Sequence, residues 1–227
     1  MKAMKKLLSN KLAVVAALIC CAILTPALSE FKSPEVSSAS DVQSPSGSSA
    51  SGVVVLDVAL DPEGNITGIE VPRPIETLTP VAIAAVRNWK FTPARVHAVA
   101  TSSDIRIAFV FRPRVIYAGM PVFEPLLNSG DPSARSLVGY HPPGIQTVAY
   151  PDYPINAANV GAVAIRARIN SAGKSDQIEV LRAFEPFTAF ALEAIKKWTF
   201  ETARLEGRPT TSSIVIAFVY SPPAISY

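Results

Sequence analysis

The chain has 227 residues, of which 49% are hydrophobic and 17% are charged, and its formal net charge is +3. This composition excludes a disordered or fibrous polymer and is typical of one or two globular domains. Four of the 21 basic residues precede residue 12, which leaves 17 basic against 18 acidic residues and a net charge of −1 for 30–227. A nearly neutral chain gives no electrostatic reason to expect nucleic-acid binding.

Residues 1–29 have the pattern of an export signal. A basic start is followed by an apolar run over 12–24 and by Ala27-Leu28-Ser29, which fits a small-residue cleavage site. Cleavage there would make Glu30 the first residue. Cys20 and Cys21, the only cysteines of the chain, lie inside this segment and so provide the folded part with no disulfide, nucleophile or ligand.

Two alternatives remain for this segment. An uncleaved membrane anchor over 12–28 would have 17 apolar-rich residues, the lower limit for spanning a bilayer. A lipidated Cys20 is the other alternative, although Ala17-Leu18-Ile19 lacks the small residue expected directly before such a cysteine. Residues 30–51 are rich in Ser and Pro, and we expect them to form a flexible linker.

An internal repeat dominates the rest of the chain. A shift of 109 residues aligns 52–113 with 161–222 without a gap, and about 23 of 62 positions are identical. Apolar residues alternate over 54–60 and over 163–169, which predicts a half-buried strand in each copy. A turn follows each strand, with a glycine (Gly64, Gly173) at the same register.

After this turn each copy has a second strand, ending at 69–71 or 178–180, and then a helix. Thr79 and Thr188 are the expected N-caps, and apolar residues recur at helical spacing as far as Trp89 and Trp198. A third strand with alternating apolar residues ends each copy. The sequence therefore predicts an α+β fold of two tandem β-β-α-β units, each an antiparallel three-stranded sheet covered by one helix.

The repeated unit resembles the C-terminal domain of TonB and related periplasmic proteins. The second copy carries Gly161, Gly173, the run Lys196-Lys197-Trp198-Thr199-Phe200-Glu201-Thr202-Ala203 and then Gly207-Arg208-Pro209. The first copy carries Trp89-Lys90-Phe91-Thr92-Pro93-Ala94, which is closer to the W-x-F-x-P-A of that family. A Tyr-Pro element of the family is matched by Tyr150-Pro151 before the second copy and by nothing before the first.

These boundaries give the expected domain organisation. It consists of a signal peptide or anchor (1–29), a linker (30–51), a first TonB-C-terminal-like unit (52–113), a connecting segment (114–149), a second unit (150–222) and a tail (223–227). The apolar residues of the connecting segment suggest that it lies against one of the units.

The resemblance implies a non-enzymatic protein-binding module of the cell envelope, in the periplasm, that binds an extended segment of a partner by strand addition. The partner implied is an envelope protein such as an outer-membrane receptor. An exposed sheet edge presents unpaired N–H and C=O groups to such a segment. We expect these edges on the two final strands, and the residues that would contact the partner are Ile105, Ile107, Phe109, Ile214, Ile216 and Phe218.

Two other functions stay open. The first is a membrane-anchored, TonB-like energy transducer in transport across the outer membrane, facing the periplasm from the inner membrane. The apolar helix lacks the histidine that this class uses, and a linker of about 22 residues is short for it. The second is a structural envelope protein whose final strands pair with each other and leave no peptide site.

The motif residues Trp89, Phe91, Trp198 and Phe200 are expected in the cores, and Arg95 and Arg204 are expected either to cap the last carbonyls of the helices or to contact a partner. No enzyme or cofactor site is expected. His97 and His141 stand alone without other ligands at metal-binding spacing, and the repeated Glu70 and Glu179 fit the solvent face of a strand.

Overall fold

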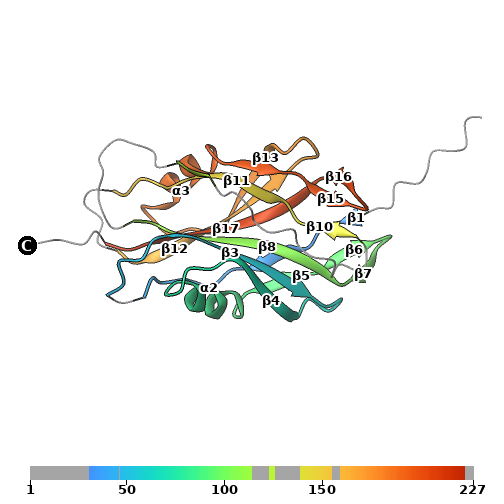
Figure 1. The fold of residues 1–227 in the computed structure, drawn as a ribbon, viewed down its shortest axis with the longest axis horizontal. Helices are drawn as coiled ribbons and strands as arrows, with labels where there is room; N and C mark the ends of the chain where they lie inside the picture. Colours follow the sequence, from blue (N-terminus) through green and yellow to red (C-terminus); the bar gives the residue numbers. More distant parts are fainter. Residues whose placement is uncertain (1–30, 46, 114–122, 126–138, 155–158, 223–227) are drawn as a thin grey trace, which may run out of the picture.

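The computed structural model describes residues 31–45, 47–113, 123–125, 139–154 and 159–222 (Figure 1). A six-stranded sheet with the order β13-β12-β17-β8-β3-β4 forms its centre. The strands are β3 (Gly52–Leu60), β4 (Ile66–Arg73), β8 (Ser103–Phe111), β12 (Gly161–Ile169), β13 (Ser175–Arg182) and β17 (Ser212–Tyr220). The fold is therefore mixed α+β and rich in strands, as expected.

Each repeat contributes three neighbouring strands to this sheet. β4, β3 and β8 come from the first copy, β13, β12 and β17 come from the second, and the pairs within each copy are antiparallel. The two copies do not form the two separate sheets that we expected, because β8 and β17 pair with each other in parallel. The final strands are long and apolar on both faces, and this pairing buries them.

The parallel pair is offset by one residue from the repeat. Val215 lies opposite Ile107, a shift of 108 residues, whereas the two copies are related by 109. Neighbouring residues on paired strands must point to the same face of the sheet. The one-residue offset therefore places equivalent residues, such as Ile107 and Ile216, on opposite faces.

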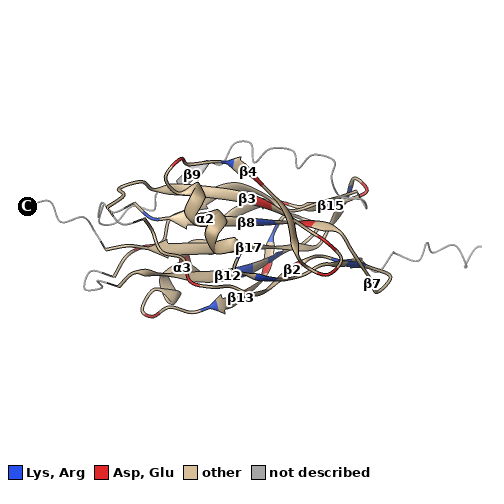
Figure 2. Ribbon diagram, turned by 90° about the horizontal axis from the view of Figure 1, so that it is seen from below, with Lys and Arg blue, Asp and Glu red and all other residues tan. Residues whose placement is uncertain are grey.

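Because of this inversion, the two helices cover opposite faces of the sheet (Figure 1). α2 (Thr79–Val86) packs on the face that carries Leu56 and Phe109, and α3 (Thr188–Ile195) packs on the face that carries Ile165 and Phe218. Figure 2 looks onto the α2 side, with β3, β8, β17 and β12 running across the sheet. Both faces of the shared sheet are thus buried, which explains why the positions between the alternating large apolar residues of β8 and β17 are mostly buried as well.

The helices begin differently from the expectation. Neither helix has a side-chain N-cap hydrogen bond. The hydroxyl of Thr79 instead accepts a hydrogen bond from the backbone N–H of Ile75 at 2.8 Å, and Thr188 accepts one from Phe184 at 3.0 Å. Each threonine therefore fixes the turn that leads into its helix.

A chain of short strands follows each helix. In the first copy these are β5 (Lys90–Thr92), β6 (Ala94–Val96) and β7 (Val99–Thr101), and in the second β14 (Thr199–Glu201), β15 (Ala203–Leu205) and β16 (Arg208–Thr210). The β6–β7 and β15–β16 hairpins lie at the same end of the molecule (Figure 1).

The segment that we expected to be a flexible linker is part of the fold. β1 (Phe31–Lys32) pairs with β6, and β2 (Glu35–Ser38) pairs with β5. The side chains of Val36 and Val42 are 0% and 3% exposed and belong to the core under α2. Strand pairing and two buried valines fix the segment although its composition is rich in serine, so composition alone gave the wrong prediction.

The repeat therefore starts earlier than Gly52. β10 (Tyr140–His141) pairs with β15, and β11 (Gly144–Ala149) pairs with β14, at the same 109-residue shift and with the same register shift as in β1 and β2. The rings of Phe31 and Tyr140, which are equivalent positions, contact each other with centroids 5.0 Å apart. β9 (Phe123–Pro125) adds a further strand to β11.

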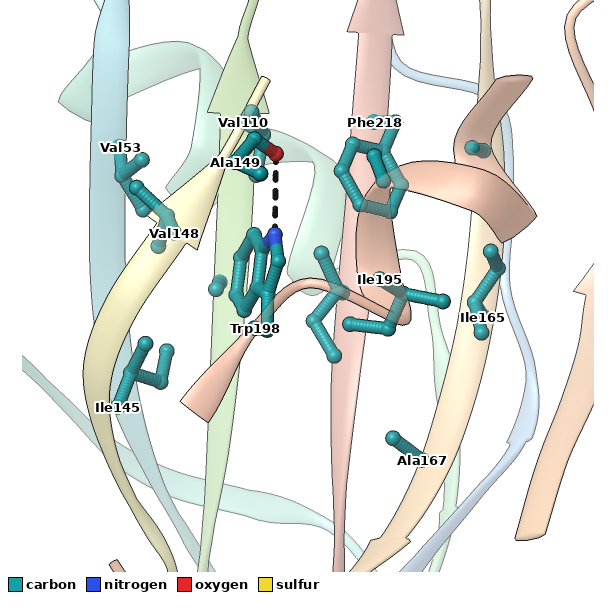
Figure 3. Packing of buried hydrophobic residues seen from close by; sticks show 14 of the residues in the cluster. Val53, Val110, Ile145, Val148, Ala149, Ile165, Ala167, Ile195, Trp198 and Phe218 are labelled. Atoms are coloured by element: carbon teal, nitrogen blue, oxygen red, sulfur yellow. Dashed lines mark hydrogen bonds between the residues drawn. The ribbon is translucent and has the colours of Figure 1, made fainter. Parts of the chain in front are cut away.

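Figure 3 shows the core under α3. Val148 and Ile145 of β11 face Trp198, and the indole Nε1 of Trp198 donates a hydrogen bond to the carbonyl of Ala149 at 3.0 Å. The leading strand is thus tied to the end of α3 by both apolar packing and a buried polar contact.

Several predictions fall outside the described residues. These are the signal or anchor over 1–29, the tail over 223–227 and most of the connecting segment (114–122 and 126–138). In the part of the chain that the structure describes, no helix has the length and hydropathy needed to cross a membrane.

Candidate protein-binding edges

The final strands are not edges of the sheet. β8 and β17 are its two central strands and pair with each other from Val215–Ile107 to Val219–Phe111. The six residues expected to contact a partner there are at most 1% exposed: Ile105, Ile107, Phe109, Ile214, Ile216 and Phe218. The expectation of an exposed edge at these residues is wrong, because the second copy occupies the edge of the first.

The outer edges of the sheet are formed by the second strand of each copy. β4 pairs only with β3, and β13 pairs only with β12, among the residues that the structure describes. Each outer strand has eight residues and follows a tight turn. Strands of this length leave a row of backbone N–H and C=O groups on the outer side, to which another strand can add.

A groove of about 610 Å³ lies beside β4. It is lined by 63–69 of the β3–β4 turn and β4, by Ile83 and Arg87 near the end of α2, and by 89–91, which lead into β5. The lining includes five apolar side chains that are partly or fully buried: Ile66, Ile69, Ile83, Trp89 and Phe91. The charged residues that line it are Glu63, Arg87 and Lys90.

The turn at the mouth of this groove is held by a carboxylate. Asp61 accepts hydrogen bonds from the backbone N–H of Asn65 at 2.7 Å and of Glu63 at 3.0 Å. The side-chain amide of Asn65 adds a third at 2.9 Å, and these bonds lower the pKa of the Asp61 carboxyl. In the second copy the neutral Asn170 holds the equivalent turn, and its Oδ1 accepts hydrogen bonds from the backbone N–H groups of Ala172 and Lys174.

Close packing fixes the position of this turn. Gly64 has φ +86°, and a Cβ placed on it would lie 2.6 Å from the carbonyl oxygen of Phe91. Only glycine combines this backbone conformation with so close an approach. The β3–β4 turn is therefore docked onto β5, which sets the position of the outer strand relative to α2.

A smaller cavity of about 210 Å³ lies between the β1–β2 segment and the second copy. Its lining is polar, and Arg166 and Arg168 enter it. Arg166 donates to Glu179 at 2.6 Å, and Arg168 donates to Asp176 at 2.8 Å, which raises the pKa of Arg168 and lowers that of Asp176. The cationic charges of this cavity are thus already neutralised by neighbours on the adjacent strand.

The motif aromatics lie where each helix ends. Trp89, Trp198 and Phe200 are 3%, 6% and 5% exposed, and Phe91 is half-buried. The two tryptophans differ in one respect. Nε1 of Trp198 has the Ala149 carbonyl as its acceptor, whereas the buried Nε1 of Trp89 has no hydrogen-bond partner among the described residues.

Arg95 and Arg204 do not cap the helices, so the capping alternative is wrong, and a contact with a partner stays a prediction. Arg95 donates to the carbonyl of Ala98 at 3.0 Å, and Arg204 donates to that of Gly207 at 3.0 Å. Both bonds brace the turn of a hairpin, β6–β7 or β15–β16, in which His97, Ala98, Glu206 and Gly207 have positive φ. The repetition of these arginines therefore reflects the geometry of the turns.

The histidines and acidic residues are dispersed. His97 lies in the β6–β7 turn, and His141 of β10 lies opposite Arg204 of β15 in the strand register. Among the described residues, no three His, Cys, Asp or Glu side chains are grouped as a metal site requires.

Sequence reasoning missed the outer edges and the groove. It also missed that residues 31–38 repeat 140–147, although three aligned pairs carry that signal: Phe31 and Tyr140, Pro34 and Pro143, and Val36 and Ile145. The orientation of one copy relative to the other has no comparable signal in the sequence.

Comparison with protein families gave a match that covers both copies. The model of the Gram-negative bacterial TonB protein C-terminal domain matches residues 48–113 and 146–222. No curated protein and no solved structure matched the chain. Domains of this kind are periplasmic and mediate protein contacts in the cell envelope. Together with the duplicated β-β-α-β order, the match shows that this chain belongs to the family of TonB C-terminal domains.

Proposed function

We propose that this chain is a non-enzymatic, periplasmic protein-binding module that binds an extended segment of an envelope partner by strand addition to an outer edge of its sheet. The observation that carries this proposal is the position of β4 and β13, which pair on one side only in the described structure. Backbone groups at such an edge supply hydrogen bonds to a partner of any sequence, and neighbouring side chains supply the selectivity.

The self-pairing of β8 and β17 shapes the proposal. It occupies the two strand edges that the family resemblance first suggested as binding sites. It also joins the two copies into one sheet. Binding at an outer edge extends this sheet from six to seven strands without disturbing its core. An outer-membrane receptor remains the kind of partner that the family implies.

Site-specific photocross-linking in the periplasm of a Gram-negative host tests the proposal. A benzophenone amino acid replaces Thr67 in β4 or Asp176 in β13, which are equivalent and both exposed. Glu206, exposed in the β15–β16 turn, is the control position. Mass spectrometry then identifies the cross-linked residue of the partner.

Strand addition makes a specific prediction for this experiment. Moving the probe two residues along the strand, from Thr67 to Ile69, must move the cross-link by two residues along the partner. A probe at the control position Glu206 must give no cross-link to this segment of the partner. Cross-links that do not shift in this way, or that form equally at Glu206, contradict strand addition.

A structural envelope protein is the second candidate, and the β8–β17 pairing favours it. In that case the duplication serves only to pair the two final strands with each other, so that neither of them is an exposed edge. The absence of cross-links from both Thr67 and Asp176 in cells that express the protein at its native level would support this candidate over the first.

A further inference from the structure

We infer that the groove beside β4 is the binding site, and that it selects an extended segment with an apolar side chain and, two residues away, an acidic side chain on the same face. This inference rests on the proposed function and adds to it the edge that is used and the chemistry of the partner. It is carried by the side chains around the groove and by their replacement in the second copy.

The groove offers apolar side chains to a strand that adds to β4. Ile66 and Ile69 of β4, Ile83 of α2 and Phe91 of β5 line it and are only partly buried. A strand paired with β4 directs every second side chain to the α2 face of the sheet, where these residues lie. An apolar side chain at such a position would bury surface that the folded chain leaves half exposed.

The rim of the groove carries two unpaired cations. Arg87 follows the last turn of α2 and Lys90 begins β5, both are exposed, and neither has an ion-pair partner among the described residues. Glu63, across the groove in the β3–β4 turn, is the acidic residue of the lining. The groove therefore has an excess of one positive charge, which complements a carboxylate on the occupant.

The second copy differs from the first at several of the equivalent positions. Ser175 replaces Ile66, and Thr199 replaces Lys90. Lys196 replaces Arg87, but it donates to Glu193 at 2.6 Å, a bond that lowers the pKa of Glu193. The first copy has Ala84 in place of Glu193, so Arg87 has no such neighbour. The other apolar positions are kept as Ile178, Leu192 and Phe200, and Lys174 and Ala172 replace Asn65 and Glu63. The two flanks thus differ in Ile66 and in the position of their cations, which lie at the end of α2 and the start of β5 in the first copy.

The test uses two synthetic peptides and the chain from Glu30 onward, purified from the periplasm. Each peptide has nine residues, with Thr at the odd positions. The first has Val and Glu in alternation at the even positions, and the second has Lys in place of Glu. All even-numbered side chains then face one side of the extended peptide. Affinity is measured by titration calorimetry at low and at high salt.

Two double variants with the same change of charge separate the groove from general electrostatics. Arg87→Gln/Lys90→Gln removes the cations of the groove, and Lys196→Gln/Lys197→Gln removes the pair at the end of α3. We expect the first variant to bind the Glu peptide about five-fold more weakly, the effect of two exposed ion pairs, and the second to bind it as the unmodified chain does. Urea unfolding confirms that both variants remain folded.

Three results overturn the inference: equal affinity for the Glu and Lys peptides, no binding of either peptide, or equal weakening by both double variants. None of these results by itself contradicts strand addition, because cross-links that shift in register along β13 would still support the proposed function. Loss of the cross-links at both edges contradicts the proposed function instead. The two failures are thus distinguishable.

Discussion

Arg106 and Asp57 form a bidentate ion pair in the middle of the sheet. Nε and Nη2 of Arg106 donate to Oδ1 and Oδ2 of Asp57, each at 2.7 Å, and the two residues lie opposite each other on β8 and β3. They are 1% and 7% exposed. The equivalent positions in the second copy hold Arg166 and Val215, so this buried pair distinguishes the first copy.

Removal of the acid from this pair should be strongly destabilising. Asp57→Ala leaves a buried guanidinium without its carboxylate, and we expect the free energy of unfolding to fall by about 3–5 kcal/mol. Urea denaturation measures the change. Asp176→Ala, which breaks the exposed pair with Arg168, is the control and should cost less than about 1 kcal/mol.

The double variant Asp57→Leu/Arg106→Met tests whether the pair itself stabilises the sheet. Burial of two charges is expensive, so we expect this variant to be close to the unmodified chain in stability. A loss as large as that of Asp57→Ala would show that the shape of the pair, beyond its charge, is required.

The two motif tryptophans should respond differently to the same substitution. Trp198→Phe removes the donor to the Ala149 carbonyl and leaves that buried oxygen without this bond, whereas Trp89→Phe removes an N–H that has no acceptor among the described residues. We therefore expect Trp198→Phe to be more destabilising by about 1–2 kcal/mol. Thermal and urea unfolding of the two variants provide the comparison, and equal losses would contradict the assignment.

The leading strand of the first copy should contribute to stability. Val36 is fully buried, so Val36→Ser should lower the free energy of unfolding by about 2 kcal/mol. Ser37 is exposed on the same strand, and Ser37→Ala should change it by less than about 0.5 kcal/mol. If Val36→Ser were equally silent, the segment would be a linker, as its composition suggested.

The two equivalent turns predict a difference in acid stability. Hydrogen bonds from Asn65 hold the pKa of Asp61 below its usual value, so the ionised carboxyl stabilises the fold at neutral pH. This contribution is lost as the pH falls through the folded-state pKa. Asp61→Asn, which copies Asn170 of the second copy, should make stability less dependent on pH below about 4, as unfolding curves between pH 2 and 7 will show.

The reverse substitution is the matched control. Asn170→Asp places a carboxyl where Ala172 and Lys174 already donate to the side-chain oxygen. We expect it to add pH dependence in the same acid range. A pH profile that is unchanged in both variants would contradict this account of the turns.

Local sequence patterns predicted the three long strands and the helix of each copy, but not the short strands before Gly52 and after each helix. Alternation located β3, β8, β12 and β17, and the helical spacing of Ala82, Ala85 and Val86 identified the buried face of α2. These features depend on burial within one copy, and an apolar residue type directly indicates that its own position is buried. The family match over both copies confirms the resemblance that the Trp-x-Phe motifs suggested.

Relations between the copies could not be predicted in the same way. The apolar residues of β8 and β17 indicate a buried strand, but they do not state which strand covers them. The linker prediction failed because serine-rich composition masked the buried Val36. The groove was missed because Arg87 and Lys90 become significant only when α2, β4 and β5 are placed together.

The joining of two copies in one chain has a consequence for divergence. Separate subunits that paired through their final strands would be identical, so every substitution would appear on both sides, and their association would depend on protein concentration. Covalent linkage of the copies removes both constraints. Ile66 and Arg87 on one side and Ser175 and Lys196 on the other can therefore vary independently, and a duplicated chain can specialise one flank while the other remains a support.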